Sequence, residues 1–295
     1  MNSENLTKGF VDRKQVARRF SRIAPGYAQS DFFVREVDRR MQARLDYVRL
    51  APTRVLDLGC SGGGSVAMLS ARYPQAQLFG VDFAEAMLKV ARPARTGWAR
   101  WLTRDAGPKY LAADAEALPL APRSMGLVWS NLMLHWLDSP LPALAEAHRV
   151  LDVGGLLMFS TLGPDTLCEL RQAFSDGYAH TQRFTDMHDL GDMLVESGFS
   201  DPVVDMEMIT LTYDDLSTLF AELRAAGSSC AMHARRHGLT GAKRLAAARS
   251  AYEAMRQAGK LPASFEVIYG HAWKAAPKQT ADGRAIVRFD RSPRR

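Results

Sequence analysis

The chain has 295 residues, of which 47% are hydrophobic and 24% charged, and its formal net charge is +6. This composition is typical of a soluble globular enzyme with one large or two smaller domains. No apolar run reaches the roughly 18 to 20 residues of a transmembrane helix, and the first residues do not resemble a secretory signal, so we expect a cytoplasmic protein without membrane contacts. Three widely separated cysteines, Cys60, Cys168 and Cys230, indicate reduced thiols rather than disulfides or a zinc site.

Much of the positive charge lies at the C-terminus. Residues 275–295 contain six Lys or Arg against two Asp, which accounts for +4 of the +6. We expect this basic segment to be a disordered tail. The rest of the chain is nearly balanced in charge and has no basic stripe interleaved with aromatic residues, so nucleic-acid binding is not expected.

The first 160 residues predict helices followed by alternating strands and helices. Val16, Phe20 and Ile23 have helical spacing in a first helix, which Pro25-Gly26 separates from a second helix at about 31–50. Strands are then expected at 54–58, 77–82, 110–113, 126–131 and 156–161, and helices at 65–73, 84–91 and 141–151, with a less regular stretch around Trp98 and Trp101. Such alternation favours a parallel sheet with right-handed crossovers.

The regular alternation ends after Thr161. Thr185 is predicted to cap a helix that runs to Ser197, and 202–213 predicts a strand. A helical insertion at about 214–260 precedes a last strand at 265–273. The predicted fold is therefore α/β and Rossmann-like. Its expected organisation is an N-terminal helical lid segment (1–50), one catalytic domain (51–274) and the basic tail (275–295).

The junction at 55–65 carries the strongest functional signal, because an apolar strand leads directly into a glycine cluster and then a helix. Open α/β sheets bind nucleotides at such junctions. Glycine lets the backbone approach a ligand closely, and the N–H groups of the new helix point at it. A nucleoside cofactor is therefore the first hypothesis.

Polar residues end the next strands at the same edge of the predicted sheet. Asp82 follows Gly59 by 23 residues, a position from which a carboxylate accepts hydrogen bonds from ribose hydroxyls. Asp114 can hold an exocyclic adenine amine, and Asn131 lies beside the expected reactive end of the cofactor. The predicted cofactor site consists of Asp57, Gly59, Ser61, Gly63, Asp82, Phe83, Asp114, Ala115 and Asn131.

This order and spacing resemble the class I S-adenosylmethionine-dependent methyltransferases over about 55–161. The resemblance implies a seven-stranded sheet whose last strand is antiparallel, with S-adenosylmethionine as cofactor and S-adenosylhomocysteine as product. Two features depart from the family: Ser61 replaces the middle glycine of its loop, and Gly126 stands where the family commonly has aspartate. A dinucleotide site is the rival hypothesis, since Gly62, Gly64 and Ala67 fit G-x-G-x-x-A, but that fit begins four residues beyond the strand.

Segments outside this core resemble the malonyl-acyl-carrier-protein O-methyltransferases of biotin synthesis. The matching segments are Arg18-Arg19-Phe20 with Tyr27, 130–136 (SNLMLHW), 159–167 (FSTLGPDTL), 209–213 (ITLTY), 238–241 (GLTG), 261–263 (LPA) and 266–273 (EVIYGHAW). The resemblance implies transfer of a methyl group to the free carboxylate of malonyl-acyl carrier protein or malonyl-CoA. A carboxylate with a pKa near 4 is already ionised, so no general base is required.

The candidate catalytic residues under this hypothesis are Tyr27, His135 and Phe184, which would form an apolar wall and donor set, and Arg171, which could grip the malonyl carboxylate through a bidentate fork. Arg224 could do the same. Packed core aromatics and solvated helix faces are the structural alternatives for these residues. No metal site is expected, because His233 and His237 are separated by Ala234-Arg235-Arg236 without a carboxylate.

A basic patch could face the carrier protein. It would comprise Arg235, Arg236, Lys243 and Arg244, with Arg18, Arg19 and Arg22 as further members, although a solvated face is the alternative. Two other functions stay open for a chain of this fold. A closely similar group is thought to hydroxylate an arginine of a respiratory-complex subunit, for which we find no redox-metal ligands. An assembly factor of the respiratory complex that retains the pocket without catalysis is the other.

Overall fold

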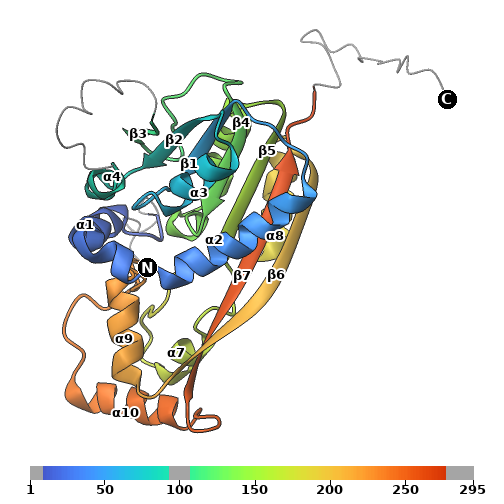
Figure 1. The fold of residues 1–295 in the computed structure, drawn as a ribbon. Coiled ribbons are helices and arrows are strands. Elements are labelled where there is room, and N and C mark those ends of the chain that lie inside the picture. The colour runs from blue at the N-terminus through green and yellow to red at the C-terminus, as the bar shows by residue number, and fades with distance from the viewer. Residues whose placement is uncertain (1–8, 93–106, 277–295) are drawn as a thin grey trace, which may run out of the picture.

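The computed structural model describes residues 9–92 and 107–276, and its centre is a seven-stranded sheet with the order β3-β2-β1-β4-β5-β7-β6 (Figure 1). The strands are β1 (Arg54–Leu58), β2 (Gln77–Asp82), β3 (Lys109–Ala112), β4 (Met125–Asn131), β5 (Leu151–Leu162), β6 (Ser200–Tyr213) and β7 (Leu261–Trp273). The pairs among β1 to β5 are parallel, whereas β7 is antiparallel to both β5 and β6. The predicted fold class and the antiparallel last strand are confirmed.

Helices cover the two faces of this sheet. The α-helices are α1 (Arg13–Ile23), α2 (Phe32–Arg44), α3 (Gly64–Arg72), α4 (Glu85–Ala91), α6 (Leu141–Val150), α7 (Cys168–Ala173), α8 (Met187–Glu196), α9 (Leu216–Ala225) and α10 (Ala242–Glu253), and the short 3-10 helices are η2 (Ala24–Gln29), η3 (Leu45–Tyr47) and η4 (Leu134–Trp136). Alternate strand residues point to opposite faces. Val55 and Trp129 therefore pack with α2 and α3, whereas Leu56 and Val128 pack with α6 and α8.

The N-terminal segment is joined to the chain that follows α9. The Asp12 N–H donates to the Ala231 carbonyl over 2.8 Å, and the His233 N–H donates to Phe10 over the same distance. The guanidinium of Arg19 donates to the carbonyl of Cys230 over 3.0 Å and also to that of Ser229. These contacts place α1 beside the helical insertion, at the edge of the sheet where β1 ends (Figure 1).

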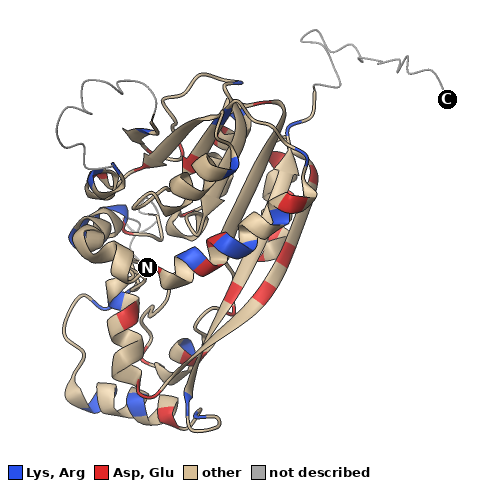
Figure 2. Ribbon diagram, in the orientation of Figure 1, with Lys and Arg blue, Asp and Glu red and all other residues tan. Residues whose placement is uncertain are grey.

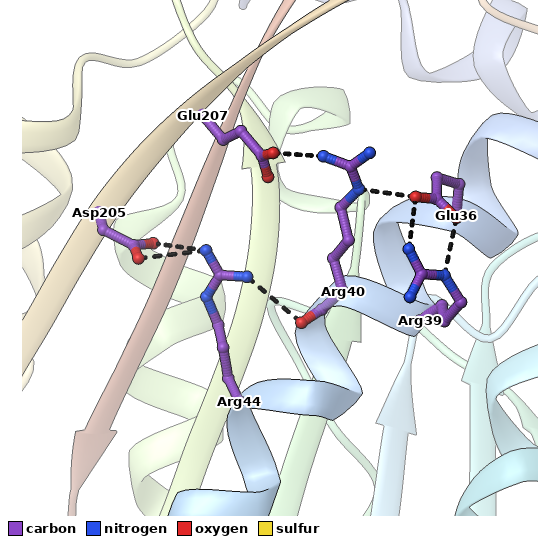
Figure 3. Close-up of polar contacts among 6 residues, drawn as sticks. All are labelled: Glu36, Arg39, Arg40, Arg44, Asp205 and Glu207. Atoms are coloured by element: carbon purple, nitrogen blue, oxygen red, sulfur yellow. Dashed lines mark hydrogen bonds and ion pairs between the residues drawn. The ribbon is translucent and has the colours of Figure 1, made fainter.

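Ion pairs fix α2 across the last two strands in the sheet (Figure 3). Arg40 pairs with Glu36 of its own helix and with Glu207 of β6, and Arg44 pairs with Asp205 of β6 over 3.1 Å. The Arg44 guanidinium also lies 3.7 Å above the centre of the Tyr269 ring. Partly exposed pairs contribute at most about 1 kcal/mol each. Their role is to orient α2, whose first turn faces the cavity described below.

Several predicted boundaries differ from the structure. The strands β5 and β7 begin earlier than predicted because their first residues pair along neighbouring strands, and the second N-terminal helix ends at Arg44 before η3. The cap of α8 is Asp186, whose side chain accepts from the His188 N–H, and not Thr185. The insertion holds α9 and α10, with no helix or strand at 226–241.

Some predictions fall outside the described residues: the stretch around Trp98 and Trp101, and the proposed disorder of 277–295. Within the part that is described, no helix is both long and apolar enough to cross a bilayer.

Candidate active site

A deep cavity opens at the carboxyl edge of β1, β2 and β4. Apolar and aromatic side chains form most of its wall, together with a few polar groups at strand ends. The lining residues that bear on function are Arg13, Tyr27, Phe32, Phe33, Gly59, Ser61, Asp82, Phe83, Asp114, Ala115, Asn131, His135, Gln182, Phe184, Tyr213, Glu222, Leu223 and Phe265. Ligands of open α/β sheets bind at this edge, as the strand-end residues predicted.

The glycine loop is built on left-handed backbone conformations. Gly59 has φ +82°, Ser61 +44° and Gly63 +83°. A Cβ atom at Gly59 would lie 2.4 Å from Cγ of Met133, so glycine is required there for both space and conformation. Ser61 replaces the family's glycine in a conformation that costs an ordinary residue about 1 kcal/mol or more. Its backbone N–H donates to Oδ2 of Asp82 over 3.0 Å, which helps to hold it.

Asp82 links the glycine loop to the start of α4. Besides accepting from Ser61, its carboxylate accepts from the Ala84 N–H over 2.8 Å through Oδ1. Burial raises the pKa of Asp82, and the two N–H donors oppose that rise. Each carboxylate oxygen keeps a lone pair after one backbone hydrogen bond. Asp82 therefore keeps an acceptor lone pair on each oxygen, which the predicted contact with the ribose hydroxyls requires.

Asp57 lies beneath the loop and does not reach the cavity wall. It is buried, and neither of its oxygens has a hydrogen-bond partner among the described residues. Burial raises its pKa well above the usual range, and the nearby Asp38 and Asp82 raise it further. Asp38 of α2 accepts from the indole N–H of Trp129 over 2.9 Å, and burial raises its pKa to about 7. Asp57 thus supports the loop from below instead of lining the cofactor cavity.

Asn131 is fixed at both ends of its amide. Its nitrogen donates to the Val34 carbonyl of α2 over 2.9 Å, and its oxygen accepts from the Ser160 hydroxyl over 2.6 Å. The side chain lines the cavity in one orientation. It ties α2 to β4 and β5 at the site, a role that the sequence pattern did not reveal.

Asp114 is joined to the N-terminal segment. Arg13 of α1 donates to Asp114 over 2.5 Å and to Glu116 over 2.8 Å. The other oxygen of Asp114 accepts from the Glu116 N–H over 3.0 Å. Phe83, which is 41% exposed, and Ala115 lie along the same wall. The Asp114 carboxylate, which is predicted to contact adenine, therefore also forms an ion pair that holds α1 at the cavity.

The three aromatic candidates all line the cavity, Tyr27 against the glycine loop and His135 beside Phe184. Tyr27 is buried, and a Cβ at Gly62 would lie 3.3 Å from its ring, so the ring packs over the loop. The ring centres of His135 and Phe184 are 6.1 Å apart. Burial raises the pKa of Tyr27 to about 12 and lowers that of His135 to about 3. Both side chains are therefore neutral at pH 7.

The predicted arginine grip is not found in the cavity. The guanidinium of Arg171 donates to the carbonyl of Pro164 over 2.5 Å and to that of Thr166, so it braces the loop after β5. Arg224 is exposed near the end of α9 and does not line the cavity. The sequence predicted a bidentate clamp because it does not show that the loop carbonyls of Pro164 and Thr166 need hydrogen-bond donors. Arg171 supplies these donors.

Other cavity residues carried no motif in the sequence. Gln182 is buried with its Oε1 unpartnered among the described residues, and Tyr213 donates to Glu222 over 2.7 Å. Burial raises the pKa of Tyr213. No group of three His, Cys, Asp or Glu side chains within 9–92 and 107–276 could hold a metal ion.

Comparison with known proteins agrees with this geometry. A family model described as a methyltransferase domain matches residues 56–159. The malonyl-[acyl-carrier protein] O-methyltransferases of Gallionella capsiferriformans and Laribacter hongkongensis are each 46% identical, over 94% and 96% of this chain and 96% and 98% of their own lengths. The chain belongs to this family. It is an S-adenosylmethionine-dependent O-methyltransferase.

Solved structures agree on the fold alone. A putative methyltransferase of Bacillus halodurans is 18% identical, with a TM-score of 0.55 over 81% of this chain and 99% of its own. The [4+2]-cyclase SpnF is 20% identical, with a TM-score of 0.51 over 81% of this chain and 82% of its own. Because a cyclase shares the fold, the reaction must be argued from the site.

The residues present fit the family's methyl donor. Asp82 offers paired acceptors at the end of β2, and the left-handed loop brings backbone close to the cavity at Gly59 and Ser61. Phe83 and Ala115 offer apolar surface for a flat base. These residues would hold the O-methyltransferase's cofactor between the glycine loop and the strand ends.

Proposed function

We propose that this enzyme methylates the free carboxylate of malonyl-acyl carrier protein, with malonyl-CoA as the alternative thioester, in the cytoplasm at an early step of biotin synthesis. Neither nucleic acid nor a membrane takes part. The observation that carries the proposal is the cavity itself, which joins the glycine loop to neutral hydrogen-bond donors and in which burial keeps His135 uncharged and weakly basic. S-adenosylmethionine supplies the methyl group from its sulfonium.

A carboxyl acceptor explains the missing base. Among the described residues near the expected acceptor, burial lowers the pKa of His135 to about 3, which makes it a poor base, and one oxygen of Glu222 accepts a hydrogen bond from Tyr213. Methylation of an alcohol or an ammonium group would require a proton acceptor near pH 7. A carboxylate has lost its proton before it binds, so this cavity suits it.

Neutral donors also suit the chemistry. The hydroxyl of Tyr27, a ring N–H of His135 and the second amide N–H of Gln182 can orient a carboxylate without forming an ion pair. The first amide N–H of Gln182 donates to the Ser229 carbonyl over 3.3 Å. A guanidinium clamp would stabilise the ionised acceptor more strongly and make it a weaker nucleophile. The placement of Arg171 outside the cavity is consistent with this reasoning. Catalysis then depends on positioning and on the exclusion of water.

Within the N-terminal segment (1–50), α1 and η2 serve as the lid in this proposal, whereas α2 stays packed on the sheet. Arg13 bridges to Asp114 and Glu116, and Tyr27 packs over the glycine loop. Both contacts come from the described part of that segment. A lid held by exposed ion pairs opens at modest cost, which permits exchange of cofactor and product.

The test is methyl transfer from radiolabelled S-adenosylmethionine to malonyl-acyl carrier protein and, separately, to malonyl-CoA. We expect a base-labile methyl ester on the malonyl group. Cofactor binding is measured on the same preparation by equilibrium dialysis. Intact cofactor binding with no base-labile label on either thioester would refute the proposal.

A further inference from the structure

Two acid-free segments lie side by side next to the cavity. Residues 13–30 contain five Lys or Arg and no Asp or Glu, and residues 223–252 contain six Lys or Arg and no Asp or Glu. Arg19 of the first segment donates to the carbonyls of Ser229 and Cys230 in the second, and the backbone bonds from Asp12 to Ala231 and from His233 to Phe10, just before the first segment, hold the two together. The fold therefore gathers positive charge from distant parts of a nearly balanced chain onto one side.

Seven of these cations are exposed and make no ion pair with any described residue. They are Lys14, Arg18 and Arg22 of α1, Arg224 of α9, and Lys243, Arg244 and Arg249 of α10, and we call them the basic strip. Arg13 and Arg235, by contrast, are paired with carboxylates. Figure 2 shows blue segments on α1, α9 and α10, with red segments also present on α9 and α10, and red segments along β6 at the other side of the view.

The strip borders the cavity. A Cβ atom at Gly227, just after α9, would lie 2.7 Å from Cδ1 of Ile23 in α1, and the Ser30 hydroxyl donates to the Ala225 carbonyl over 2.9 Å. Leu223, Ala226 and Ser228 line the cavity wall from the inside. The end of α9 therefore carries a cation on its outer side and cavity wall on its inner side.

The surface around α10 has the character of a docking face. Only Ala248 and Tyr252 of this helix are buried. In the preceding loop Leu239 is 93% exposed, and the Arg236 guanidinium donates to its carbonyl over 2.9 Å. Like charges gathered without partners repel each other and do not stabilise the fold. An apolar side chain among such cations suits a partner that combines negative charge with apolar contact.

We propose that the basic strip, with Leu239, is the docking surface for an acidic carrier protein whose thioester arm enters the cavity beside α9. This inference rests on the proposed function, which supplies the carrier as substrate. The strip complements an acidic partner in charge, and such complementarity chiefly raises the association rate and weakens with salt.

Charge reversal tests the surface directly. We compare the full-length enzyme with K243E/R244E and R18E/R22E, and with the control R49E/R54E, whose exposed arginines lie just before and at the start of β1, at the edge away from the cavity. Binding of the unloaded holo-carrier protein is measured by fluorescence anisotropy at low and high salt. At low salt we expect affinity to fall about tenfold or more in both strip variants and less than about twofold in the control.

A second measurement separates docking from chemistry. We expect kcat/KM for malonyl-carrier protein to fall with the binding loss, and kcat/KM for malonyl-pantetheine, which lacks the carrier, to stay unchanged. Unchanged carrier binding in both strip variants would overturn the inference. An equal fall of kcat/KM for malonyl-pantetheine would also overturn it, as would wild-type enzyme that binds a DNA duplex as tightly as the carrier protein. If the wild type formed no methyl ester from either thioester, the proposed function would fail, and the binding measurement would still decide the docking surface.

Discussion

Replacement of Asp38 by asparagine should make the protein more stable at high pH. Asp38 lies on α2 beneath the glycine loop, only 2% exposed, and accepts from the Trp129 indole. Burial raises its pKa from 3.8 to about 7, against the opposing hydrogen bonds of Trp129 and Ser65. Ionised Asp38 also raises the pKa of the buried Asp57. A negative charge on Asp38 or on Asp57 is therefore unfavourable in the folded state.

The size of the expected stability change follows from the shift in the pKa of Asp38. A rise of the Asp38 pKa from 3.8 to about 7 corresponds to about 4 kcal/mol at 1.36 kcal/mol per unit. Because the folded state holds the proton more tightly than the unfolded state, this contribution is fully present below pH 3.8 and is lost as the pH rises through 7. About 2.5 kcal/mol of the loss falls between pH 5 and pH 8. Asparagine keeps an acceptor for Trp129 and has no charge to bury.

The assay is urea denaturation of wild type and Asp38→Asn at pH 5, 6, 7 and 8. We expect the unfolding free energy of wild type, relative to that of Asp38→Asn, to fall by about 2 to 3 kcal/mol between pH 5 and pH 8. Asp189→Asn, at an exposed position on α8, is the control for the loss of one carboxylate. Parallel stability profiles for wild type and Asp38→Asn would refute the reasoning.

Three further predictions concern the cavity itself. Gly59→Ala should unfold or lose cofactor binding, because its Cβ would meet Met133 at 2.4 Å, whereas Gly64→Ala, with nothing within 4 Å, should resemble wild type in thermal melts and dialysis. Asp82→Ala should weaken cofactor binding at least about tenfold, because two acceptors are lost, and unchanged affinity would contradict the pocket assignment. The pH profile of kcat/KM should show no step near pH 6.5 from His135, whose pKa is lowered to about 3; a step abolished by His135→Phe would contradict its burial.

Local patterns predicted the sheet and the loop well. The strand, glycine and helix sequence at 55–65 is contiguous, so its geometry follows from neighbouring residues. Asp82 and Asn131 each end a strand, and Asp114 follows the end of β3 by two residues. Parallel strands bring their carboxyl ends to one edge. These residues therefore lie near each other even though they are far apart in sequence, and the cavity could be located before its shape was known.

Such patterns do not predict which residues far apart in the chain form hydrogen bonds or ion pairs with each other. The Asp38–Trp129 bond joins residues 91 positions apart, and the Arg13–Asp114 bond spans 101. Arg171 has the helical setting of a solvated or ligand-binding cation, but only tertiary structure brings it to the carbonyls of Pro164 and Thr166. Asp57 matched a family position, and its burial beneath the loop depends on α2 packing over it. In each case the partner lies on another element, and sequence spacing carries no information about it.

The structure separates positive charge from the acceptor site, and this separation addresses a difficulty of carboxyl methylation. An anionic substrate is most simply bound by a cation, yet a cation at the carboxylate would weaken it as a nucleophile. Here the neutral Tyr27 and His135 face the acceptor wall, while Lys243 and Arg244 lie outside on α10. Positive charge at the surface can then provide affinity for an acidic carrier without weakening the reacting carboxylate oxygen as a nucleophile. Salt should consequently raise KM for the carrier substrate with little effect on kcat.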